Sequence, residues 1–103
     1  TTKTPVPSLP NLPTLASGAL PGFEVGVWHG LYAPKGTPKP VVDALANALR
    51  ASLRDPNVIK RFNDLGTEPV PTNQATPEAL RTHLKQQIDL WGPIIKKAGA
   101  FAD

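Results

Sequence analysis

The chain has 103 residues, which is the length of a single domain. Charged residues make up 18% and hydrophobic residues 40%, a composition typical of a globular protein and not of a disordered one. No run approaches the roughly 20 apolar residues of a membrane-spanning helix. Because the sequence contains no cysteine, it excludes disulfides, thiolate metal sites and cysteine nucleophiles. The net charge is +3, but the basic residues are dispersed, which argues against a specific nucleic-acid binder.

Proline is the unusual residue of this sequence, with thirteen copies. Residues 1–22 contain Pro5, Pro7, Pro10, Pro13 and Pro21. Each proline fixes φ and biases the preceding residue away from the α region, so we predict an extended N-terminal strap over residues 1–22. Leucines at intervals of three indicate that this strap lies against a surface that it helps to cover. A short helical turn is predicted over residues 13–17.

Residues 23–33, FEVGVWHGLYA, alternate in the manner of a β-strand. One face carries Phe23, Val25, Val27, His29 and Leu31. The other face carries Glu24, Gly26, Trp28, Gly30 and Tyr32. The two glycines leave room beside the two aromatic rings, and such room admits a neighbouring backbone or a ligand.

Three helices are predicted from a repeated pair, a capping residue followed by proline. The pairs are Thr37-Pro38, Asp55-Pro56 and Thr76-Pro77. Gly66 is the expected end of the second helix and Gly99 that of the third, which we expect to be kinked at Pro93. Between these two helices, residues 67–71 predict only a short edge strand, because two prolines remove ladder donors. The order of elements predicts an α/β fold.

The sequence contains few residues in patterns typical of a catalytic or metal-binding site. Its two histidines, His29 and His83, have no partner at metal-ligand or catalytic spacing, and no phosphate-binding or nucleophile motif is present. We therefore predict a protein that is not an enzyme and that has no metal and no cofactor. His83 borders the apolar face of the last helix and is interpreted as structural. A small enzyme that uses His29 stays as an alternative, although an ordinary strand residue is favoured.

Three motifs, taken in order, resemble the C-terminal part of a known receptor family. They are LP-x-LPT from Leu9 to Thr14, W-x-G-x-x-AP-x-GTP from Trp28 to Pro38, and W-x₆-AG from Trp91 to Gly99. The family is the Bug, or TctC-like, periplasmic solute-binding component of tripartite tricarboxylate transporters. The resemblance covers essentially the whole chain.

The resemblance implies a type 2 periplasmic-binding architecture, in which two α/β lobes close over a small carboxylate. The expected fold is a partial lobe with a few strands, three main helices and the proline-rich strap. Residues 1–22 would be the strap that crosses between lobes, and residues 23–103 the C-terminal part of the first lobe. Family receptors are much longer chains, so we expect a fragment or truncated copy that is unable to bind fully alone, with a signal peptide upstream.

The resemblance also implies a ligand site at Trp28, His29 and Gly30, on the strand that leads toward the cleft. The expected partners are a small carboxylate and the membrane subunits of the transporter, and not nucleic acid. Self-association is a further expectation, because the missing part of the lobe would leave apolar surface uncovered. The alternative function is a standalone interaction or nucleic-acid-binding module that uses a basic helix surface formed by Arg50, Arg54, Lys60 and Arg61.

Overall fold

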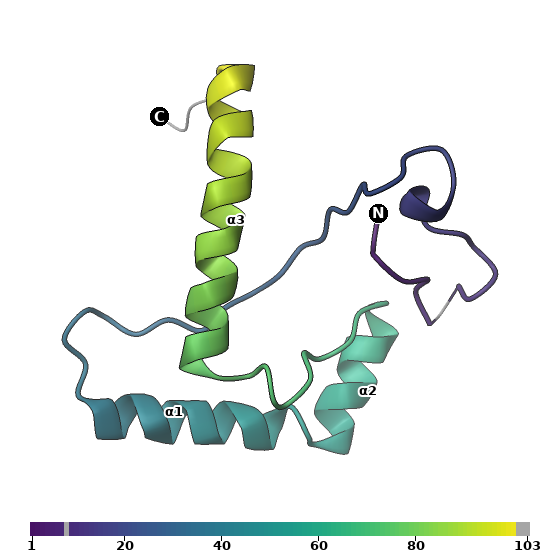
Figure 1. Cartoon of the computed structure of the whole chain (residues 1–103). Helices are drawn as coiled ribbons and strands as arrows, with labels where there is room; N and C mark the ends of the chain where they lie inside the picture. The colour runs from purple at the N-terminus through teal and green to yellow at the C-terminus, as the bar shows by residue number, and fades with distance from the viewer. Residues whose placement is uncertain (8, 101–103) are drawn as a thin grey trace.

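The computed structural model describes residues 1–7 and 9–100. Its elements are a 3₁₀-helix η1 (Leu15–Ser17) and the α-helices α1 (Lys39–Ser52), α2 (Pro56–Asp64) and α3 (Pro77–Ala98). In Figure 1, α1 lies along the bottom, α2 stands at its C-terminal end, and α3 rises steeply from above the middle of α1. The N-terminal residues form loops at the right of the view. An extended segment leads from these loops past α3 to α1.

No strand forms among the described residues, so the predicted strands at residues 23–33 and 67–71 are not confirmed. The first of these segments does run extended in Figure 1. However, a strand exists only as part of a hydrogen-bonded ladder, and no second strand lies beside this segment. Its one backbone hydrogen bond to a distant residue joins the N–H of Val25 to the carbonyl of Thr1 at 3.0 Å. The α/β prediction therefore holds for the helices alone.

The predicted extended run at the N-terminus is instead a series of turns. The N–H of Leu9 donates to the carbonyl of Val6 at 2.8 Å, and the N–H of Leu12 donates to that of Leu9 at 3.1 Å. Pro7 and Pro10 each follow the acceptor residue, which is the position that proline favours in a β-turn. The predicted helical turn is present as η1, capped by the side chain of Thr14.

Two of the three predicted helix starts are confirmed. The side chain of Asp55 accepts from the N–H of Asn57 at 2.8 Å, and that of Thr76 accepts from the N–H of Ala79 at 3.1 Å. The prediction for Thr37 is wrong. Its hydroxyl donates to the carbonyl of Pro34 at 2.8 Å, so it closes the preceding turn and α1 begins after Pro38.

The C-terminal end of α3 is confirmed in detail. Gly99 adopts a left-handed conformation with φ 67, and its N–H donates to the carbonyl of Lys96 at 3.2 Å. The next N–H, of Ala100, donates to Ile95 at 3.2 Å, which is the Schellman arrangement. The predicted kink does not break the helix, since α3 continues through Pro93 as one element.

The described residues enclose almost no core. Ala75, 6% exposed, is the one buried residue among them. The radius of gyration is 16.7 Å, whereas a compact domain of this length has about 13 Å. The accessible surface is 8558 Å², against about 5,600 Å² for a compact protein of this mass. The apolar faces of the helices are therefore formed as predicted but are largely uncovered.

Candidate functional site

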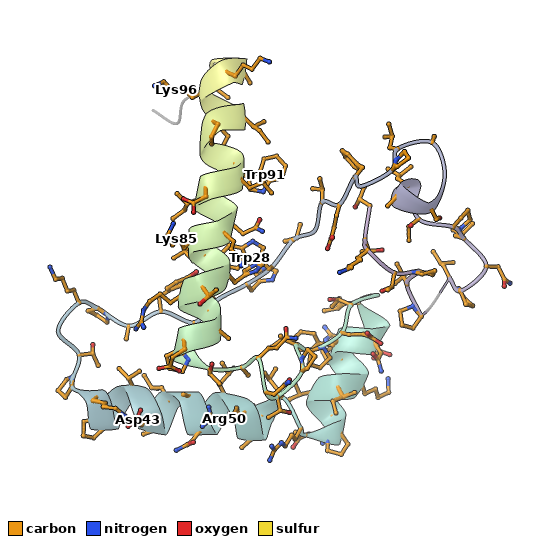
Figure 2. The ribbon with its side chains drawn as sticks, viewed as in Figure 1. Trp28, Asp43, Arg50, Lys85, Trp91 and Lys96 are labelled. Carbon is orange, nitrogen blue, oxygen red and sulfur yellow. The ribbon has the colours of Figure 1, made fainter. Side chains whose placement is uncertain are left out.

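The side chain of Trp28 rests against α3 (Figure 2). Its ring meets that of His83 edge to face, with centroids 4.7 Å apart and planes at 85°. Aromatic pairs prefer this geometry because the positive edge of one ring meets the negative face of the other. The Nε2 atom of His83 is buried and has no hydrogen-bond partner, so the imidazole is held by packing and not by a polar network. This position agrees with a structural role for His83.

An open groove of about 380 Å³ lies between the extended segment and α3. The segment contributes Gly26 and Trp28, and α3 contributes Leu84, Gln87, Ile88, Trp91, Gly92 and Ile95. The indole N–H of Trp91 donates to Oε1 of Gln87 at 3.0 Å, which orients the second indole. No charged side chain is among these lining residues, so the groove suits an apolar or aromatic group.

The three predicted ligand residues do not gather on one surface. Trp28 lines the groove, but His29 is exposed and is not part of the lining. Gly30 lies beneath the ring of Tyr32, because a Cβ atom at Gly30 would stand 2.9 Å from atoms of that ring. Gly30 therefore provides room beside an aromatic side chain, as the alternation predicts. In the single chain the ring of Tyr32 occupies this room.

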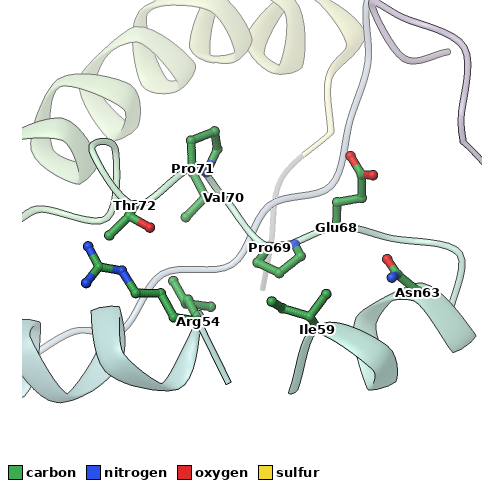
Figure 3. Close-up of a pocket in the computed structure, with 9 residues that line it drawn as sticks. Arg54, Ile59, Asn63, Glu68, Pro69, Val70, Pro71 and Thr72 are labelled. Carbon is green, nitrogen blue, oxygen red and sulfur yellow. The ribbon is translucent and has the colours of Figure 1, made fainter. Parts of the chain in front are cut away.

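A second open groove, of about 470 Å³, lies where the end of α1, α2 and residues 68–72 meet (Figure 3). Its polar lining includes Arg54, Asn63, Glu68 and Thr72, and its apolar lining includes Ile59 and Val70. The Arg54 guanidinium gives this groove a group that suits a carboxylate. Sequence reasoning missed the groove, because three separate segments form it and none of them carries a motif.

The predicted basic helix surface is partly occupied by contacts within the chain. The Arg50 Nη1 atom donates to the carbonyl of Ala75 at 3.2 Å, and Nη2 donates to Oδ1 of Asn47. Lys60 is paired with Asp64 at 2.7 Å. Asp64 therefore offsets the charge of Lys60, whereas Arg50 keeps its charge but has its donors engaged within the chain, and both effects count against the contiguous basic stripe that nucleic-acid binding requires.

No group of three or more histidine or acidic residues is placed to hold a metal ion within residues 1–7 and 9–100. In those residues no helix has the length and apolar character needed to cross a bilayer.

The class of protein is shown by comparison with known families. Residues 2–100 match the model of the tripartite tricarboxylate transporter family receptor, TctC, and the chain belongs to this family. This match confirms the resemblance carried by the three motifs. No solved structure matches the chain significantly.

Individual relatives are longer than this chain. It is 44% identical over 99 residues to the UPF0065 protein in the TAR-I ttuE-ttuC' intergenic region of Agrobacterium vitis, covering 96% of this chain and 29% of that protein. It is 38% identical over 92 residues to the UPF0065 protein in the clcB-clcD intergenic region of Pseudomonas knackmussii, covering 88% and 53%. Protein BugT of Bordetella pertussis is 30% identical over 91 residues, covering 88% and 27%. The chain thus spans about a quarter to a half of these relatives.

Proposed function

We propose that this chain supplies part of one lobe of a periplasmic solute-binding receptor for a tripartite tricarboxylate-type transporter. The family match over residues 2–100 is the observation that carries the proposal. The activity is binding and delivery of a solute, not catalysis, and the membrane subunits of the transporter are the downstream partners. A small carboxylate is the proposed ligand class.

The uncovered surface of the chain supports the proposal that it forms only part of a receptor. The chain exposes roughly 3,000 Å² more than a compact protein of its mass, and its match covers 29% of the Agrobacterium relative. In a complete receptor the remaining chain would cover the apolar faces of α1 and α3 and supply the second lobe. Capture of the ligand between lobes needs groups from both, so this chain alone is proposed not to bind fully.

Within the receptor, Trp28, His29 and Gly30 are proposed to border the ligand cleft. In the single chain Trp28 alone lines a groove, and the side chain of Tyr32 would have to turn away to uncover Gly30. The groove beside Trp28 has no charged residue in its lining, so it would contact an apolar part of the ligand. The carboxylate charge would then be met elsewhere, by groups of the other lobe or by the exposed side chain of His29. A carboxylate that carries an aromatic or aliphatic body fits this arrangement better than a fully polar one.

The test uses a complete receptor in which this sequence replaces the matching segment of the Agrobacterium relative. Thermal shift is measured with dicarboxylates, tricarboxylates, amino acids and aromatic acids. A ligand at 100 times its Kd stabilises the folded state by about 2.7 kcal/mol, which gives a readily measured rise in Tm. A folded chimera with a flat response across the panel would contradict the proposal.

The site is tested with two variants of the same chimera. Trp28→Ala and His29→Ala should each reduce the thermal shift given by the active ligand, because each removes a group proposed to face the cleft. Lys97→Ala, an exposed position near the end of α3, is the matched control and should leave the shift unchanged. Full shifts in both site variants would remove these residues from the ligand site.

A further inference from the structure

The groove between the extended segment and α3 has one amide side chain, Gln87, among its aromatic and aliphatic lining residues. Gln87 lies one helical turn before Trp91, whose indole N–H donates to its Oε1 atom at 3.0 Å. Because an indole nitrogen can only donate, this bond fixes which end of the amide faces Trp91. The amide nitrogen of Gln87 donates to no described residue, although Gln87 is half-buried. Its two N–H groups are therefore available to an acceptor in the groove.

The unused polar side-chain atoms of the lining residues are all donors. Trp28 also has an indole N–H without a hydrogen-bond partner among the described residues. The one side-chain acceptor of the lining, Oε1 of Gln87, already accepts from Trp91. The other side chains of the lining are aliphatic: Leu84, Ile88 and Ile95. Since a few polar groups in an apolar lining orient a ligand, this groove favours a ring with an acceptor oxygen over a ring with a donor.

The walls of the groove are formed within this chain. Trp28 is held against α3 by its edge-to-face contact with His83, with ring centroids 4.7 Å apart. Gly26 and Gly92 also line the groove, and a Cβ atom at either position would meet nothing within 4 Å. The volume of about 380 Å³ lies within the roughly 300–1,000 Å³ of small-molecule pockets. The groove therefore has room for a substituted aromatic ring beside the two indoles.

We infer that this groove holds the ring of an aromatic carboxylate and that Gln87 donates to an acceptor oxygen on that ring. The indoles of Trp28 and Trp91 contact the ring, and Gln87 determines which substituent is accepted. The carboxylate of this ligand rests on the proposed function, in which its charge is met outside the groove. The ring and its acceptor oxygen rest on the groove alone.

The groove is tested first in the single chain with acetophenone, which has the ring and the acceptor oxygen but no carboxylate. NMR titration follows the side-chain amide of Gln87 and the two indole N–H groups, which should shift with one shared Kd. Gln87→Glu keeps an acceptor for Trp91 but has no N–H to donate, so it should weaken binding about fivefold, the effect of one hydrogen bond. Gln86→Glu adds the same charge at an exposed position outside the groove and should leave the Kd unchanged.

The specificity is tested in the receptor chimera with two acids of nearly equal shape. The para-acetyl derivative of benzoate carries a carbonyl acceptor, and the para-isopropyl derivative carries a methyl group in its place. The ratio of their Kd values, measured by isothermal titration calorimetry, cancels the common carboxylate and the charge that a variant adds. Gln87→Glu should shift this ratio about fivefold against the acetyl derivative, and Gln86→Glu should not change it.

Two results overturn the inference. One is the absence of shifts at Gln87 and at both indoles when acetophenone is added to the single chain. The other is a chimera that binds both acids with a ratio that Gln87→Glu leaves unchanged, because another part of the receptor then occupies the groove. A chimera that binds neither acid, beside a single chain that binds acetophenone through Gln87, contradicts the proposed receptor function and supports the ring site.

Discussion

Trp28 and His83 join two distant parts of the chain through an edge-to-face contact of 4.7 Å between ring centroids. The contact fixes the extended segment against α3 and thereby forms one wall of the groove that also contains Trp91. Few other contacts hold the extended segment against α3, because the described residues have almost no buried core.

Removing His83 should release Trp28 from α3. An aromatic pair contributes about 0.5–1.5 kcal/mol beyond the area that it buries, so His83→Ala should weaken docking of the segment by about this amount. The measurement is acrylamide quenching of Trp28 in a Trp91→Phe background, where it is the one remaining indole. His29→Ala, at an exposed neighbouring position, should not change the quenching. Equal quenching in the His83→Ala variant would contradict the packing role.

Arg50 is predicted to hold the loop before α3. It is half-buried, and its guanidinium donates to the carbonyl of Ala75 at 3.2 Å. Arg50→Ala should destabilise this loop by about 1 kcal/mol, the typical net value of one hydrogen bond. Amide hydrogen exchange at Ala75, measured by NMR, should become about fivefold faster. Arg54→Ala, one turn further along the chain, should leave that exchange rate unchanged, and a similar effect of both variants would point to a general loss of charge.

A glycine inside α3, Gly92, and the glycine that ends it, Gly99, should respond oppositely to substitution by alanine. A Cβ atom added at Gly92 meets nothing within 4 Å, so Gly92→Ala should stabilise the helix by about 0.5–1 kcal/mol. At Gly99 the backbone has φ 67, so Gly99→Ala strains the left-handed C-terminal turn and should lower helix stability by a comparable amount. Circular dichroism of the two variants against temperature measures both effects. A gain in helicity for both would contradict the assigned helix end.

The pKa of Lys39 is raised above its ordinary value, first by a hydrogen bond from its ammonium to Asp43 at 2.5 Å and then by the charge of that carboxylate. Because the pKa is higher in the folded chain, the stabilising contribution is complete below the ordinary lysine pKa. It is lost as the pH rises through the raised value. Asp43→Asn should therefore lower the pKa of Lys39, as followed by NMR titration of its side chain. Asp64→Asn, in the equivalent pair of α2, should leave it unchanged.

The helix ends could be predicted from the sequence because their causes are local. The caps at Asp55 and Thr76 and the left-handed turn at Gly99 are each satisfied within a few residues. The predicted start of α1 at Thr37 is wrong for an equally local reason, because Thr37 belongs to the preceding turn, where its hydroxyl donates to the carbonyl of Pro34.

The strands and the site could not be predicted in the same way. Alternation in residues 23–33 indicates a strand, but a ladder needs a second strand, and the described chain does not supply one. Likewise, the spacing of glycines and rings indicates space near Trp28. It does not reveal that His83 and Trp91 border this space, because that depends on how α3 crosses the segment.

The backbone hydrogen bonds of this chain have a consequence for how it melts. Among the described residues, the bond between Val25 and Thr1 is the one backbone hydrogen bond that joins residues more than five positions apart. Each helix is therefore stabilised mainly by its own backbone hydrogen bonds. Unfolding of one helix should change the stability of the other helices little. Heating the single chain should give a broad, helix-by-helix transition with a van't Hoff enthalpy below the calorimetric one. All-or-none melting would appear only once another polypeptide covers the apolar faces and couples the helices to one another.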